Sequence, residues 1–302
     1  SSPNDQQRWA VESHYSKSGN YLIINGGGDQ VGSLVVFDGN NGKLKWINET
    51  SHSKVVFDCD FSADETLLAT ASYDNSARVW DIESGKEHTR PLVSNAGFWH
   101  CRFTMDQTKL ITGDYNSNCQ VWDINNGTLL QNTFKQESPI LAVAATEDPN
   151  KAIVTLLNGR VALWDISRNN RRPILLTHNL QIMNSQLLPD DHIATSGLDA
   201  KVKVWDLKNL GEYRTLKVEE DVWWMDYSAS SKRLFGIMCS GWVNAKGVMV
   251  WNWPDLSVHK KYMLPEDSSR VGIHPDGNII AYSKGDDFSI QLYDLSRGQN
   301  IQ

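Results

Sequence analysis

The sequence predicts an all-β fold that repeats one unit. Residues 55–86 contain three strand-like stretches, VVFDCDF, LLATAS and ARVWDI, separated by the turn sequences ADE and YDNS. Weaker copies of this unit follow one another, and the aromatic residue that ends the third stretch recurs every 41 to 46 residues. It stands at Phe37, Trp80, Trp122, Trp164, Trp205, Trp251 and Tyr293. Propeller blades repeat at this period, so the sequence predicts a seven-bladed β-propeller of four-stranded antiparallel blades.

The blades follow in order as a single domain. Their predicted limits are residues 9–50, 51–93, 94–136, 137–176, 177–217, 218–262 and 263–302. In the first blade the strands WAVESHY, YLIING and SLVVFD leave a connection, GGGDQVG, whose glycines favour a flexible turn. Its run Gly26–Gly28 lacks the Lys-Ser/Thr pair of a phosphate-binding loop. The outer strand of the second blade is expected in EHTRPLV, after Lys86.

The later blades keep the same order of strands. The third contains FWHCRF, KLITGD and NCQVWDI, and the fourth ILAVAAT, AIVTLL and RVALWDI. The fifth contains HIATSGLDAKVKVWDL, the sixth DVWWMDYS and RLFGIMCSGWVNAKGVMVWNW, and the seventh NIIAYSKGDD and SIQLYDL. In the sixth, Ser240–Lys246 is predicted to be a lengthened loop. The residues after Asp294 are expected to form the last outer strand and close the ring.

The third strands end in VWD at 79–81, 121–123 and 204–206 and in LWD at 163–165, with weaker versions in the other blades. In these residues the chain resembles the WD40 repeat family. The resemblance implies the family's hydrogen-bonded tetrad of His, Ser or Thr, Asp and Trp, which can be placed twice. The predicted tetrads are His52, Thr70, Asp74 and Trp80, and His178, Thr195, Asp199 and Trp205.

A His-Thr-Asp set also has the composition of a catalytic triad, but here it is predicted to be structural. A buried indole N–H needs an acceptor, a hydroxyl can accept and donate, and an imidazole held by a carboxylate completes the network. Two other blades depart from the pattern. Ser94 stands where the third blade would have its His, and Asn116 and Asn158 replace the turn Asp.

Composition excludes several classes of function. The chain has 29 Lys and Arg against 36 Asp and Glu, and the net charge of −7 argues against non-specific binding to nucleic acid. No apolar run approaches the ~20 residues of a membrane span. The four cysteines lack metal-binding spacing, and Cys59 and Cys101 are predicted to be buried in first strands. This usage favours an intracellular protein, cytoplasmic or nuclear, although glycosylation triplets at Asn48 and Asn126 point the other way.

No residue pattern points to catalysis. The sequence shows no repeated metal-ligand set, no nucleophile elbow and no paired carboxylates beyond the turn acids, so no catalytic residue, metal or cofactor is predicted. The most basic loop, with Arg168, Arg171 and Arg172, is either a solvated loop or a contact for an acidic partner.

The predicted functional site lies at one mouth of the central channel, which the first strands line. Counting four residues back from the end of each first strand gives Val11, Phe57, Trp99, Leu141, Met183, Trp223 and Ser269. The resemblance implies that this register forms the top mouth, where WD40 proteins often accept a side chain or peptide of a partner. The residues that follow include Asp58, His100, Asn184 and Trp224 as further contacts, with Asp58 supplying charge for a basic ligand. The predicted partner-binding residues are Phe57, Asp58, Trp99, His100, Met183, Trp223 and Trp224.

These observations favour a non-catalytic interaction platform that binds a peptide or protein surface at the top mouth, within a larger intracellular complex. Two alternatives remain within binding proteins: a reader of tails carrying methylated lysine or arginine, and a substrate receptor of a ubiquitin ligase. An enzyme with a propeller active site is disfavoured. In the alternative interpretation, the aromatic residues of the mouth are ordinary core residues that line the channel.

Overall fold

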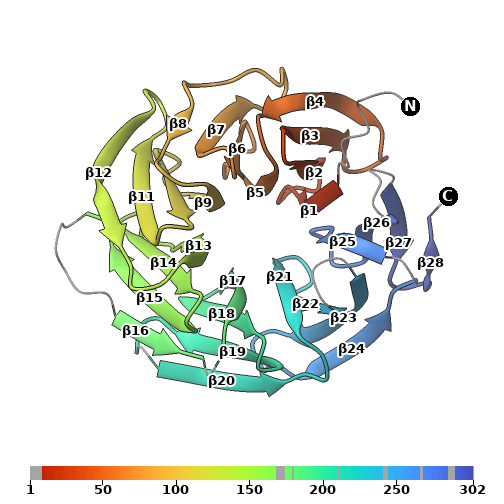
Figure 1. Ribbon diagram of the computed structural model, residues 1–302. Coiled ribbons are helices and arrows are strands. Elements are labelled where there is room, and N and C mark those ends of the chain that lie inside the picture. Colours follow the sequence, from red (N-terminus) through yellow and green to blue (C-terminus); the bar gives the residue numbers. More distant parts are fainter. Residues whose placement is uncertain are drawn as a thin grey trace.

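The computed structural model describes residues 9–167, 174–178, 180–209, 211–240, 244–265, 268–284 and 290–301. Within these ranges the chain forms seven antiparallel sheets of four strands each, arranged as a ring around one axis (Figure 1). The predicted seven-bladed propeller is therefore confirmed. Among the described residues there is no helix of the length and apolar character needed to cross a membrane.

Each blade consists of four consecutive strands. The first strands are β1 (Trp9–Tyr15), β5 (Val56–Phe61), β9 (Phe98–Phe103), β13 (Ile140–Ala145), β17 (Ile182–Leu188), β21 (Val222–Ser228) and β25 (Ser268–Ile273). The second strands are β2 (Tyr21–Gly28), β6 (Leu67–Ser72), β10 (Lys109–Asp114), β14 (Lys151–Leu156), β18 (His192–Gly197), β22 (Arg233–Ser240) and β26 (Ile279–Lys284).

The third strands are β3 (Val31–Asp38), β7 (Ser76–Asp81), β11 (Asn118–Asp123), β15 (Arg160–Asp165), β19 (Lys201–Asp206), β23 (Asn244–Asn252) and β27 (Ile290–Asp294). The outer strands are β4 (Leu44–His52), β8 (Leu92–Val93), β12 (Thr128–Lys135), β16 (Ile174–Thr177), β20 (Gly211–Lys217), β24 (Val258–Met263) and β28 (Gln299–Asn300). Figure 1 shows the first strands around the axis and the outer strands at the rim. We call the channel end at which the first strands begin the top mouth and the other end the bottom mouth.

The core lies between the faces of neighbouring blades. Second strands such as β6 and β10 are buried along almost their whole length, because both faces of the sheet are covered by adjacent blades. Each fully buried aliphatic side chain, such as Ile23 or Leu110, contributes about 1.5–3 kcal/mol of transfer free energy. Cys59 and Cys101 belong to this core, as predicted, and none of the four cysteines forms a disulfide.

Two expected loops are strands. Gly26–Gly28 belong to β2, and only Asp29 and Gln30 turn the chain into β3. Glycine is needed there because Gly27 has φ of 133° and a Cβ would lie 2.1 Å from the Val31 carbonyl oxygen. In the sixth blade, where a loop was expected at Ser240–Lys246, Ser240 belongs to β22 and is paired with Asn244 of β23, and Lys246 lies at a bulge of β23. Residues 241–243 of the expected loop lie outside the described residues.

The outer strands of the second and seventh blades were both expected from the sequence. The expected outer strand in EHTRPLV is reduced to Leu92 and Val93, with one isolated bridge between Trp80 and Glu87. At the end of the chain, β28 pairs with β27 through Asn300 and Gln299, which confirms that the residues after Asp294 supply the last outer strand. The basic loop with Arg168, Arg171 and Arg172 lies outside the described residues.

Candidate functional site

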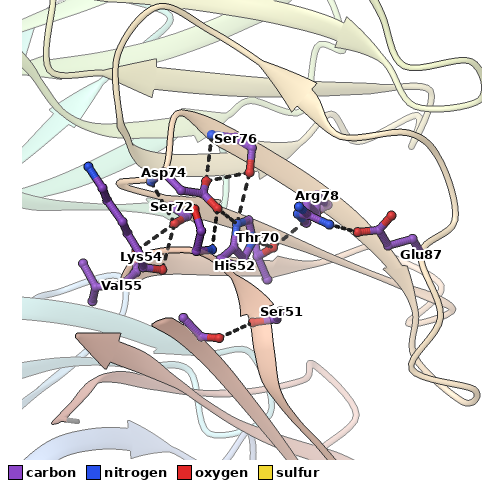
Figure 2. Close-up of polar contacts among 12 residues, drawn as sticks. Ser51, His52, Lys54, Val55, Thr70, Ser72, Asp74, Ser76, Arg78 and Glu87 are labelled. Atoms are coloured by element: carbon purple, nitrogen blue, oxygen red, sulfur yellow. Dashed lines mark hydrogen bonds and ion pairs between the residues drawn. The ribbon is translucent and has the colours of Figure 1, made fainter. Parts of the chain in front are cut away.

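The structure brings the four residues of the first predicted tetrad into one hydrogen-bonded chain. The Trp80 indole N–H donates to Thr70 Oγ1 at 3.0 Å, Thr70 Oγ1 lies 2.8 Å from His52 Nε2, and His52 Nδ1 lies 3.0 Å from an Asp74 oxygen. This order of donors requires the His52 proton to be on Nδ1. Figure 2 shows Asp74, on the turn that joins β6 to β7, also receiving bonds from Ser76, the first residue of β7. The histidine is thus held on both nitrogens within the protein.

The second predicted tetrad has the same arrangement in the fifth blade. The Trp205 indole donates to Thr195 at 2.7 Å, His178 Nε2 lies 2.8 Å from the same hydroxyl, and His178 Nδ1 lies 3.3 Å from Asp199. Both histidines are buried, so neither imidazole is presented to a substrate. The arrangement ties each incoming outer strand to the blade that follows it.

The third blade reaches a similar network through a residue that the sequence analysis missed. Asp114, at the end of β10, is fully buried and accepts from Ser94 Oγ at 3.3 Å and from the Asn118 backbone N–H at 2.8 Å. Trp122 still donates to Thr112. In the third blade the carboxylate lies at Asp114, two positions before Asn116, which is the residue that corresponds to Asp74 in the repeat. A position-by-position comparison of repeats therefore does not find it.

The tetrad histidines predict a pH dependence of stability. Burial lowers the pKa of His52 and of His178 below the ordinary 6.5, against the opposing effects of Asp74 and Asp199. A histidine with a lowered folded pKa stabilises the fold above about pH 6.5, and that stability is lost as the pH falls below this value. We expect the free energy of unfolding, measured with urea, to fall more steeply between pH 7 and 5 in the wild type than in a His52→Gln, His178→Gln variant.

The difference between the pH profiles of the wild type and the variant isolates the contribution of the two histidines, because the other groups that titrate in this range are present in both proteins. Asp60 in particular acts in the opposite direction, because burial raises its pKa to about 6. Parallel pH profiles for the wild type and the variant would show that the two imidazoles do not control this dependence.

At the top mouth the first strands share a β-bulge. Six of the seven positions counted from the sequence are the bulged residues, namely Val11, Phe57, Trp99, Leu141, Met183 and Trp223. In the last blade the expected residue Ser269 is paired with Ser283, and the bulge falls at Arg270. A bulged residue leaves the ladder of hydrogen bonds, and the bulge redirects its side chain.

Four aromatic side chains form a row at the top mouth, which we call the aromatic row: Tyr73, Phe57, Trp99 and Tyr115. Phe57 and Trp99 stack with centroids 4.8 Å apart and planes 6° apart, and Trp99 stacks on Tyr115 at 6.0 Å and 23°. Tyr73 meets Phe57 edge-on at 6.0 Å, and Lys54 Nζ lies 5.1 Å from the Tyr73 ring centre. The tyrosines are 45% and 53% exposed, so the row is open to a partner at both ends.

The two tyrosines were missed because they read as turn residues. Each follows a second strand, and its backbone N–H is bonded to the residue before the first strand: Tyr73 to Val55 and Tyr115 to Gly97. A Cβ on Gly97 would lie 2.7 Å from the Tyr73 ring, so glycine at that position makes room for the row. The signal that could have found them is a tyrosine at the same repeat position in two adjacent blades.

On the far side of the mouth the predicted residues belong mainly to the core. Trp223 is 7% exposed and packs with Ile237, Cys239 and Val271. Met183 and Trp224 are half-buried against the same cluster, and the two indoles are tilted by 39° at 6.0 Å. The expectation that Trp223 is a principal anchor for a partner therefore differs from the structure, since little of its ring is accessible.

Asp58 and Asn184 join neighbouring blades instead of facing a ligand. Asp58 is fully buried, accepts from the Cys101 backbone N–H at 3.0 Å and from His100 Nδ1 at 3.1 Å, and forms an ion pair with Arg102. Asn184, at the equivalent position of β17, accepts from the Met225 N–H at 3.4 Å. Burial disfavours the charge of Asp58, yet Arg102 and His100 hold its pKa well below the usual range. Asp58 is neutralised internally and does not supply charge for a basic ligand.

Among the described residues no group of three or more His, Cys, Asp or Glu side chains is placed to hold a metal ion. The buried acids and histidines described above are bonded within networks that link strands or blades. The accessible side chains that the structure describes at the top mouth include Tyr73 and Tyr115 of the aromatic row.

Comparison with known proteins agrees with the fold. A family model described as "WD domain, G-beta repeat" matches residues 45–81, which run from β4 of the first blade to the end of β7 of the second. The sequence repeat and the blade are therefore offset by one strand. Among solved structures, the β-propeller domain of Cps50 (Swd1) from Myceliophteria thermophila is similar with a TM-score of 0.80 at 14% identity, over 94% of this chain and 95% of that one.

Proposed function

Because the chain is a seven-bladed propeller that carries a WD40 repeat at residues 45–81, we propose that it is a non-catalytic platform that binds a protein or peptide through the aromatic row. The single observation that supports this best is the stack of Phe57, Trp99 and Tyr115 beside the exposed ring of Tyr73. Exposed aromatic residues on a rigid scaffold are the side chains that dominate binding energy at protein interfaces.

The geometry of the row favours a flat contact. Phe57, Trp99 and Tyr115 lie nearly parallel and turn their faces toward one another, whereas a cage for methylated lysine needs ring faces directed at a common centre. We infer that an extended peptide or a surface loop lies across the row. The absence of disulfides among four buried cysteines supports a reducing compartment as the place where this partner is met.

The test uses two alanine variants: one replaces an exposed tyrosine of the aromatic row, and the other replaces a similarly exposed tyrosine elsewhere on the surface. Tyr115 is 53% exposed in the row, and Tyr213 is 49% exposed on β20 of the fifth blade. Proteins captured from cell lysate by the wild type and by Tyr213→Ala should be lost with Tyr115→Ala, because removing a central interface aromatic costs about 2 kcal/mol or more, roughly thirty-fold in affinity.

Trp99→Ala is the second variant of this test, with a thermal melt to show that the fold is retained. Identical sets of captured proteins from Tyr115→Ala, Trp99→Ala and the wild type would sink the proposal. Loss of capture with Tyr213→Ala alone would place the binding surface on the outer strand of the fifth blade instead.

A further inference from the structure

One end of the aromatic row carries an exposed ammonium group. Lys54 lies between β4 and β5, and its Nζ stands over the Tyr73 ring at 5.1 Å from the ring centre, a distance at which cation–π attraction holds a cation in place. Figure 2 shows the Lys54 backbone anchored through its carbonyl, which accepts from Ser72 Oγ at 3.1 Å. Within the described part of the chain, Lys54 Nζ forms no hydrogen bond and no ion pair. Its three N–H donors therefore face solvent beside the row.

The acids at the top of the first three blades are not paired with Lys54. Asp74 and Asp114 are bonded within the networks of the second and third blades, the Asp74 side chain being 5% exposed and Asp114 fully buried. Asp29, on the turn between β2 and β3, is exposed and forms no ion pair with Lys54. The charged group that a partner can contact directly beside Tyr73 is therefore the ammonium.

The opposite side of the top mouth has the opposite charge. Residues 219–221 lead into β21, and Asp199 lies on the turn after β18. Glu219 and Glu220 are each paired with a lysine. Burial, together with the negative charges of Glu220 and Asp199, raises the pKa of Asp221. An acidic group that approaches the top mouth is thus repelled on this side and attracted on the side of Lys54.

The spacing of the rings is suited to an extended segment. Contacts run in order from Lys54 to Tyr73, Phe57, Trp99 and Tyr115, and successive ring centres lie 4.8–6.0 Å apart. Side chains on one face of an extended chain are roughly 6.8 Å apart, twice the rise of about 3.4 Å per residue. This spacing places alternate side chains of such a segment on the rings and the next one beside the ammonium.

We propose that the aromatic row binds an acidic segment of a partner protein, in which the carboxylate of a Glu or Asp pairs with Lys54 and apolar side chains on the same face lie on the rings. This inference rests on the proposed function and names the chemistry of the partner. A carboxylate suits the site better than a phosphate, because one ammonium matches one negative charge. A phosphate group carries nearly two charges and is usually bound by a cluster of arginines.

The experiment selects binders from a library of random peptides displayed on phage, with the immobilised wild-type protein as bait. Peptides that bind the wild type and Tyr213→Ala but not Tyr115→Ala are kept as binders of the row. We expect these sequences to be enriched in Glu or Asp at alternate spacing with apolar residues. A synthetic peptide of the enriched sequence is then compared with a version that has glutamine in place of its acidic residue, by fluorescence anisotropy.

Lys54→Gln should weaken binding of the acidic peptide roughly five-fold, the value of an exposed ion pair, and Lys54→Glu should weaken it further. Added salt should weaken the same binding, whereas the glutamine peptide should respond to neither change. Lys86→Gln is the matched control, since Lys86 is an exposed lysine between β7 and β8 at the bottom of the same blade. Lys54→Glu should also bind a version of the peptide with lysine in place of its acidic residue more tightly than the wild type does. A folding defect cannot produce such a gain.

Binders of the row that lack an acidic preference would overturn this inference, as would equal affinities of the wild type, Lys54→Gln and Lys54→Glu for the acidic peptide. Either result would leave the proposed function intact. A library that yields no peptide sensitive to Tyr115→Ala or Trp99→Ala would instead contradict the proposed function, and this inference with it. The two failures are therefore distinguishable.

Discussion

Replacing Asp58 with alanine is expected to lower the free energy of unfolding by about 3–5 kcal/mol, the usual cost of removing one partner from a buried ion pair. The substitution removes the carboxylate that pairs with Arg102 and that accepts the Cys101 N–H between the second and third blades. Urea unfolding at pH 7 measures the loss of stability. A cost below about 1 kcal/mol would mean that water replaces the carboxylate at no great expense.

Asp60, two residues along the same strand, provides the matched comparison. The pKa of Asp58 is lowered, so its charged form stabilises the fold above about pH 4, and that contribution is lost as the pH falls further. The pKa of Asp60 is raised to about 6, so its charged form costs stability above that pH. Asp60→Asn should therefore leave stability at pH 7 unchanged or increase it. A large loss with Asp60→Asn would contradict this assignment of the two carboxylates.

The second large effect is expected at the tetrad threonine. Thr70→Val keeps the shape of the side chain but removes the hydroxyl shared by Trp80 and His52, which leaves two buried groups unpaired. We expect a loss of about 2–6 kcal/mol, at about 1–3 kcal/mol for each unpaired group. The measurement is chemical unfolding of the purified variant beside the wild type.

Thr112→Val in the third blade is the control for this prediction. Thr112 accepts only the Trp122 indole N–H among its side-chain hydrogen bonds, because Ser94 pairs with Asp114 rather than with Thr112. Its replacement should cost about 1–3 kcal/mol, the value for a single unpaired group. Equal losses in Thr70→Val and Thr112→Val would show that His52 does not depend on the hydroxyl.

The repeat determines how much of the fold can be predicted from sequence. The third-strand tryptophans and the turn residues after the second strands recur at one spacing, and this was enough for seven blades of four strands. Local departures from the repeat were harder to predict. Gly26–Gly28 look like a turn, yet they are strand residues paired with β3, and at Gly27 the backbone of β3 lies too close for a Cβ. Glycine content alone does not separate a turn from a close approach.

The candidate site was less predictable because it depends on contacts between blades. Asp58 and Asn184 look like ligand-facing polar residues within one repeat, but their acceptors reach the backbone of the next blade. Trp223 looks like Trp99 in register, yet its neighbours bury it whereas Trp99 stacks in an accessible row. Sequence periodicity gives the position of a side chain within its strand; the size of the residues on the adjoining blade decides its exposure.

The shared bulge of the first strands separates two kinds of constraint on the sequence. Residues on either side of it are held by ladder pairing, whereas the bulged residue contributes no pair, and its identity runs from valine and leucine to phenylalanine, tryptophan and arginine around one ring. A substitution at a bulged residue therefore leaves the ladder pairs of its blade in place. Its effect on packing differs from blade to blade, because Leu141 and Trp223 are buried in the core whereas Phe57 and Trp99 stack on each other. The same backbone irregularity thus serves packing in some blades and surface shape in others.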